Sequence, residues 1–137
     1  MEKKTLLHRQ IHPTFVVNDI VSNQAFSENE ITISSGAFTP SEKDDDKLSV
    51  YNGEKFSPKE SFDHFVNSYT SYGVLSLTVE EINSIEPLIA VEDNDPFDGH
   101  CHIDFSEVSS KNQKTKKAGK LRDFAVNRKW TYKPQSN

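Results

Sequence analysis

The stretch SPKESFDHFVNSY, residues 57–69, specifies its own structure more completely than any other part of the chain. Ser57 is a preferred helix cap, Pro58 suits the first helical position, and Glu60 can reach back to the amide of the cap. Because each of these preferences marks the same boundary, this capping box predicts a helix whose first residue is Pro58.

The rest of this stretch predicts how the helix packs. Its apolar residues recur with the i, i+3, i+4, i+7 spacing of one helical face, which predicts a buried stripe formed by Phe62, Phe65, Val66 and Tyr69. His64 lies off that stripe in a helical projection and is expected to point away from it. Gly73 offers the left-handed conformation that ends many helices.

Segments with strand character lie on both sides of the helix. Residues 5–11 alternate, which predicts a strand with Leu7 and Ile11 on one face. His8 and Gln10 are then expected on the other face. Similar alternation, or short runs of β-formers, predicts further strands at residues 48–51, 74–78, 88–91, 100–106 and 130–132.

A hairpin and a short helix are predicted between these segments. Residues 14–17 and 20–22 are rich in β-formers, and Asn18 and Asp19 separate them. Because both of these residues tolerate positive φ, a tight hairpin is expected there. A second capping box, at residues 78–81, predicts the short helix.

The order of these elements favours an α+β fold, with a mixed, mostly antiparallel sheet and two main helices packed on one face. A strict alternation of strand and helix, which is typical of doubly wound α/β proteins, is not visible in the sequence. A length of 137 residues suits a single domain, residues 1–137.

The composition predicts a cytoplasmic protein without membrane contact. The longest apolar runs are far shorter than the roughly 20 residues that cross a bilayer. Charged residues follow Leu6 and Leu7 almost directly, so no secretory signal is expected. The lone cysteine, Cys101, forms no internal disulfide and falls on the inward face of its strand, where it is expected to act as a small buried hydrophobe.

Positive charge is concentrated near the C-terminus. The whole sequence has 16 Lys and Arg against 21 Asp and Glu, but residues 111–137 hold nine Lys and Arg and a single acid, Asp123. A helix capped by Ser109 or Ser110 is predicted here, with apolar positions at Ala118, Leu121, Phe124 and Ala125. Its basic patch comprises Lys114, Lys116, Lys117, Lys120, Arg122, Arg128 and Lys129. Either this helix neutralises an acidic body on which it packs, or its basic face binds phosphates or an acidic partner.

The segment HCHID, residues 100–104, groups side chains that could carry chemistry. Alternation places His100, His102 and Asp104 on one face of a strand, with successive members about 7 Å apart. All three are candidates for catalysis and the two histidines for metal binding, because imidazole is both a general base and a zinc ligand. A further ligand would have to come from His8, His12 or Glu80. The simpler interpretation is that the two histidines face open water, and no cofactor is expected.

Several segments together resemble a group of small bacterial proteins with no established activity. These segments are LHRQIHP at residues 7–13, QAF at 24–26, KLSVYNG at 47–53 and HIDF at 102–105. The resemblance implies a bacterial cytoplasmic origin and a place in a multigene system. It assigns a role to no individual residue.

Three functions compete at this point. We expect a non-catalytic accessory or protein-binding module of a bacterial multigene system, of the defence or toxin-neutralisation type, whose acidic body meets a basic protein partner. The alternative is a small metal-assisted hydrolase that uses the row of His100, His102 and Asp104. A further alternative is nucleic-acid binding through the basic C-terminal helix, which predicts a strong dependence on salt.

Overall fold

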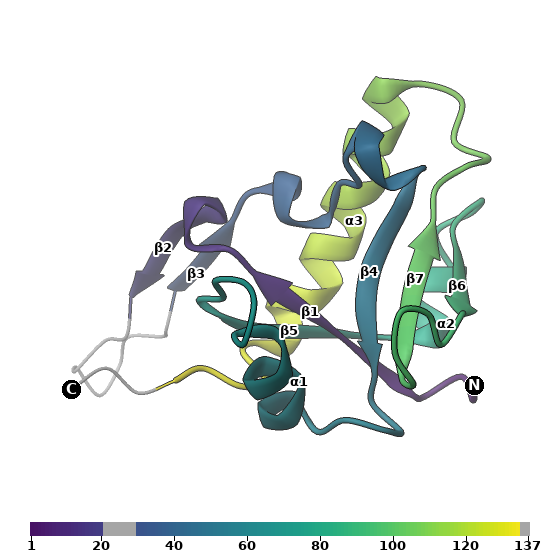
Figure 1. The fold of residues 1–137 in the computed structure, drawn as a ribbon. Helices are drawn as coiled ribbons and strands as arrows, with labels where there is room; N and C mark the ends of the chain where they lie inside the picture. The colour runs from purple at the N-terminus through teal and green to yellow at the C-terminus, as the bar shows by residue number, and fades with distance from the viewer. Residues whose placement is uncertain (21–29, 135–137) are drawn as a thin grey trace.

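The computed structural model describes residues 1–20 and 30–134. Its main sheet has the strand order β5-β1-β4-β7-β6, and each neighbouring pair is antiparallel (Figure 1). A second sheet of two antiparallel strands extends from one side of the main sheet. The strands are β1 (Leu6–Ile11), β2 (Val16–Ile20), β3 (Glu30–Ile33), β4 (Lys47–Asn52), β5 (Gly73–Thr78), β6 (Ile89–Glu92) and β7 (His100–Asp104).

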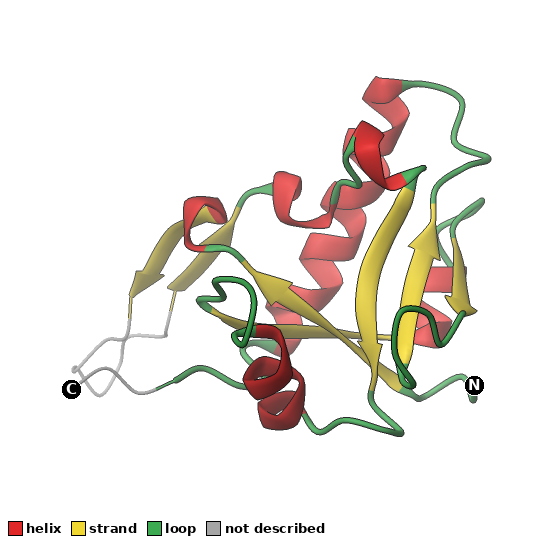
Figure 2. Ribbon diagram, in the orientation of Figure 1, coloured by secondary structure: helices red, strands yellow, loops and turns green. Residues whose placement is uncertain are grey.

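The helices of the described residues are few and mostly short (Figure 2). The α-helices are α1 (Pro58–Phe65), α2 (Val79–Asn83) and α3 (Lys111–Arg128), and the 3-10 turns are η1 (Pro13–Phe15), η2 (Ser35–Phe38) and η3 (Glu42–Asp44). With the mostly antiparallel sheet, they confirm the predicted α+β class. None of these helices has both the length and the apolarity needed to cross a membrane.

The two main helices lie on opposite faces of the sheet rather than on one. Leu7 and Ile11 of β1 are fully buried in the same hydrophobic core as Leu121 of α3. Gln10, which alternates with them, donates a hydrogen bond from Nε2 to Oγ of Ser61 in α1, at 2.9 Å. Because successive side chains of a strand point to opposite faces, α1 and α3 enclose β1 from two sides (Figure 1).

The start of α1 is predicted correctly, but its packing face is not. Oγ of Ser57 accepts from the amide of Glu60, whose carboxylate accepts in return from the amide of Ser57. The expected apolar stripe is wrong: Ser61 is the buried residue of the helix, whereas Tyr69 is 68% exposed. The reason is that α1 lies on the polar face of β1 and ends at Phe65, before the stripe is complete. Gly73 opens β5 instead of ending this helix.

The expected turn at Asn18 and Asp19 is also wrong. Both residues lie within β2, and β2 pairs with β3, so the connection runs through residues 21–29. The predicted strand at 20–22 and the QAF segment at 24–26 therefore fall largely or wholly outside the described residues.

Asp19 is held in its strand by side chains from distant parts of the chain. Its carboxylate accepts hydrogen bonds from the hydroxyl of Tyr72 at 2.8 Å, from Nε1 of Trp130 at 3.1 Å and from Nζ of Lys133 at 2.5 Å. These three donors explain why an Asp that suits a turn is instead fixed in extended backbone. The neighbouring Tyr132 forms a single antiparallel bridge to Val74, where a short closing strand was predicted.

Candidate functional site

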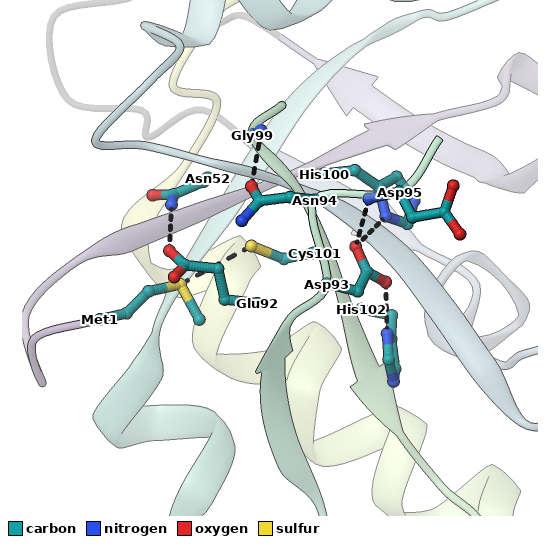
Figure 3. A network of polar contacts seen from close by, with 10 residues as sticks. All are labelled: Met1, Asn52, Glu92, Asp93, Asn94, Asp95, Gly99, His100, Cys101 and His102. Carbon is teal, nitrogen blue, oxygen red and sulfur yellow. Dashed lines mark hydrogen bonds and ion pairs between the residues drawn. The ribbon is translucent and has the colours of Figure 1, made fainter. Parts of the chain in front are cut away.

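Asp93, which follows β6, bridges the two histidines of β7 (Figure 3). Its Oδ1 lies 2.6 Å from Nδ1 of His100, and its Oδ2 lies 2.6 Å from Nδ1 of His102. The sheet produces this geometry directly. Alternation places both imidazoles on one face of β7, and the register that pairs Glu92 with Cys101 brings the next residue of the β6 side level with His100.

The expectation that this row faces open water is therefore wrong. The His102 residue is only 7% exposed, and the His100 side chain 13%. The reason is the neighbouring strand: β6 lies alongside β7, and Asp93 covers the two rings at the end of β6. The sequence contains the relevant signal, an acidic loop between two strands that pair as a hairpin, but the residues do not show that one of its carboxylates turns back onto the histidines.

The charge on Asp93 fixes which nitrogen of each imidazole ring carries a proton toward it. Burial by itself raises the pKa of Asp93, but the hydrogen bonds from His100 and His102 outweigh it and hold the pKa below the usual carboxyl value. An ionised carboxylate only accepts hydrogen bonds, so both Nδ1 atoms carry a proton. Nε2 is then the ring nitrogen left for another partner, and neither Nε2 atom bonds to a described residue.

Asp104 does not belong to this cluster, although it was predicted in the same row. Its carboxylate accepts a hydrogen bond from the amide of Ser106 at 2.8 Å, and that bond lowers the pKa of Asp104. The side chain therefore closes the turn after β7 instead of meeting the histidines.

The early histidines do not approach the late ones. His8 is buried, with Nδ1 2.7 Å from Oγ of Ser76 and Nε2 3.0 Å from the carbonyl oxygen of Phe56, and burial lowers its pKa. His12 caps η1, because its Nδ1 accepts a hydrogen bond from the amide of Thr14. Among residues 1–20 and 30–134, no group of three or more His, Cys, Asp or Glu side chains is arranged to hold a metal ion. The metal-binding hypothesis thus gains no third ligand in this part of the chain, whether from His8, His12 or Glu80.

Cys101 is a packing residue, as its place in the strand predicts. It is fully buried among the core side chains, and burial raises the pKa of its thiol to about 12. A thiol in this state is protonated at neutral pH and is a poor nucleophile.

A cavity of about 450 Å³ opens beside His100, between β4, α1 and the loop that joins β6 to β7. Half of its lining residues carry an aromatic or imidazole ring: Tyr51, His64, Phe65, Tyr69, Phe97 and His100. Tyr51 lies opposite His100 in the register of β4 and β7. The Phe97 ring lies between the two histidines of this cavity, with centroids 4.5 Å from His64 and 5.3 Å from His100.

A second polar pair faces the same cavity. The hydroxyl of Tyr51 and Nδ1 of His64 are 2.8 Å apart and share a hydrogen bond. Burial raises the pKa of Tyr51 to about 12, so its hydroxyl stays protonated at neutral pH. The sequence did not indicate this pair, because it placed His64 away from the packed face of a helix whose partner strand was unknown.

The basic patch on α3 is divided between two situations. Lys114 pairs with Asp46 at 2.5 Å, and Arg128 pairs with Glu81 at 2.8 Å, so part of the charge neutralises the acidic body, which is one of the two alternatives that the sequence leaves open. Arg122 contacts its own neighbour on the helix, Asp123. Four basic side chains form no ion pair with any described residue: Lys116, Lys117, Lys120 and Lys129.

Comparison of the chain with protein-family models, with curated proteins and with solved structures finds no match in any of the three.

Proposed function

We propose that the cavity beside His100 binds a small planar molecule, and that His100 exchanges a proton with it. One observation carries this proposal: an imidazole that lines a cavity of about 450 Å³ is oriented from behind by a carboxylate at 2.6 Å. Carboxylates orient catalytic and metal-binding histidines in the same manner.

The character of the walls supports a planar ligand. Ligand cavities of a few hundred Å³ are usually apolar with a few convergent polar groups, and this one fits that description. Phe97 and Tyr51, whose ring centroids are 5.2 Å apart, offer aromatic surfaces on which a flat ring can pack.

The chemistry follows from the atoms left for a ligand. Nε2 of His100 accepts a proton, and Asp93 stabilises the imidazolium that results. The hydrogen-bonded pair of Tyr51 and His64 offers a second donor or acceptor to the same ligand. A positioned acid or base contributes about 10²- to 10⁴-fold to a reaction rate. The expected hydrolase row is thereby revised, because Asp93 replaces Asp104 as the carboxylate partner.

The alternative of a non-catalytic protein-binding module stays a prediction. Part of its warrant is the expectation that His100 and His102 face open water. Asp93 and the adjoining cavity remove that warrant, so we place the small-molecule function first.

The test is a screen of small molecules by NMR on the labelled full-length chain. Planar heteroaromatic compounds are expected to shift the resonances of Tyr51, His64 and His100, whereas aliphatic compounds of similar size are not. Asp93→Asn is expected to weaken binding of these compounds, because it removes the carboxylate that orients the His100 ring.

Two variants and a control complete this test. His100→Gln is expected to weaken binding of the best compound about tenfold or more, and Tyr69→Ala at the exposed rim of the cavity to weaken it without risk to folding. His12→Gln, a histidine that caps η1 instead, is the matched control and is expected to bind as the wild type. The proposal would be rejected if the compounds bind elsewhere on the protein. It would also be rejected if His100→Gln and Tyr69→Ala both bind the best compound as tightly as the wild type does.

A further inference from the structure

Three lysines of α3 point outward together. Lys116, Lys117 and Lys120 have i, i+1 and i+4 spacing, which places them on one side of the helix. The buried residues of the helix lie on another side and are Ala118, Leu121 and Ala125. None of the three lysines forms an ion pair with a described residue, so their charge is directed to solvent.

The surface around these lysines is grooved. A shallow hollow of about 760 Å³ lies between the end of α2 and α3, and Lys117, Lys120 and Phe124 contribute to its lining. Two acids, Glu86 and Asp123, lie at the same hollow. A smaller hollow of about 440 Å³ adjoins the first at Lys120, and Lys116, Lys120 and Arg122 contribute to its lining. Lys120 therefore stands between two adjoining hollows, each with a further lysine.

Phe124 adds an aromatic ring to this basic surface. It is 38% exposed and lines the larger hollow beside Lys120. From Lys116 to Phe124 the helix advances about 12 Å, so the lysines and the ring follow one another along a single track. Single-stranded nucleic acid is bound by such a combination of positive charge along the backbone and aromatic faces for the bases.

We propose that this face of α3 binds single-stranded nucleic acid, with Lys116, Lys117 and Lys120 on phosphates and Phe124 stacked on a base. A protein partner fits less well, because the centre of a protein interface is apolar. Among the described residues of α3, Phe124 is the single large hydrophobic side chain that is exposed. This surface lies on the sheet face opposite to α1 (Figure 1), and its two hollows share no lining residue with the cavity beside His100, so the inference is independent of the proposed function.

The test measures the fluorescence anisotropy of labelled oligo(dT) and oligo(U), about 20 nucleotides long, with the full-length chain. Binding is expected to weaken as salt rises, with a slope of log affinity against log salt near −2, because about three phosphates lose their counterions. The triple variant K116Q/K117Q/K120Q is expected to lose binding at least tenfold. F124A is expected to weaken binding with little change in the salt slope.

Two controls separate this surface from general charge and from the cavity. K47Q/K55Q/K59Q removes the same charge from exposed lysines outside α3 that line neither hollow, and is expected to bind as the wild type. His100→Gln is also expected to bind as the wild type. The proposal is overturned if the oligonucleotides do not bind at low salt or if their binding does not depend on salt. It is also overturned if K116Q/K117Q/K120Q binds them as tightly as the wild type does. Tighter binding of poly-glutamate than of either oligonucleotide also overturns it, in favour of an acidic protein partner.

Discussion

The carboxylate of Asp93 and Nδ1 of His102 lie 2.6 Å apart at a position where the His102 residue is almost fully buried. Asp93→Ala removes the acceptor of this buried N–H and of a second one in His100. We expect the free energy of unfolding to fall by about 2 kcal/mol, the usual cost of leaving a buried donor unpaired. Urea unfolding measures this loss. Glu107→Ala removes an exposed carboxylate, is expected to change stability by less than about 0.5 kcal/mol, and serves as the control. Equal losses in the two variants contradict the prediction.

Asp19→Asn is expected to lower stability in a pH-dependent way. Burial alone raises the pKa of Asp19, but hydrogen bonds from Lys133, Tyr72 and Trp130 outweigh it and lower the pKa. A carboxyl whose pKa is lower in the folded state contributes stability above its unfolded pKa of about 3.9 and loses it as the pH falls through the folded value. We therefore expect a deficit of about 2 kcal/mol at pH 7, narrowing below about pH 4.

Urea unfolding at neutral and acid pH measures this deficit in Asp19→Asn. Asp63→Asn, an exposed carboxylate in α1, controls for the removal of charge. A deficit that stays the same at about pH 3 and pH 7 contradicts the assignment of a lowered pKa to Asp19.

Two glycines are expected to respond in opposite directions to the same substitution. A Cβ at Gly53 lies 2.3 Å from the carbonyl oxygen of Leu6, whose hydrogen bond with the Gly53 amide joins β1 to the turn after β4. Gly53→Ala is therefore expected to destabilise the fold by several kcal/mol or to prevent folding. Gly119→Ala places its Cβ 3.7 Å from the nearest atom, in the middle of α3. It is expected to raise the melting temperature, because alanine favours a helix by about 1 kcal/mol over glycine. Thermal unfolding of the two variants measures both effects. A Gly53→Ala protein as stable as the wild type would contradict the close approach between residue 53 and the carbonyl oxygen of Leu6.

The packing face of α1 is tested by a pair of substitutions with contrasting outcomes. Ser61 is fully buried and bonded to Gln10, so Ser61→Leu is expected to cost about 1–3 kcal/mol by overpacking and by loss of that bond. Tyr69→Ala is expected to leave stability within about 0.5 kcal/mol, because the ring is largely exposed. The reverse order, with Tyr69→Ala the more damaging, would restore the apolar stripe that the sequence suggests.

Local signals in the sequence predict the boundaries of elements well, because the relevant partners are close in the chain. The capping boxes at Ser57 and Thr78 are both present, since cap and acceptor are three residues apart. Alternation likewise places His100 and His102 on one face of β7. What alternation cannot predict is which strand lies beside that face, and here the neighbour is the one that ends at Asp93.

The errors arise where a distant part of the chain decides the outcome. Asp19 suits a turn by its own preference, but Trp130 and Lys133 hold it in a strand. The stripe on α1 assumes an apolar partner, whereas the face of β1 that receives the helix carries Gln10. The Tyr51 and His64 pair depends on the same contact between helix and sheet, so the cavity could not be derived from spacing.

The contacts of Asp19 with Trp130 and Lys133 span 111 and 114 positions. During synthesis on the ribosome they cannot form until residues 130–133 have emerged from the exit tunnel. Until then, the Asp19 carboxylate lacks its cationic partner Lys133. The N-terminal strands likewise lack the contacts that later parts of the chain provide. A truncated translation product that stops before Lys133 therefore keeps this defect, which makes it a ready target for quality-control proteases.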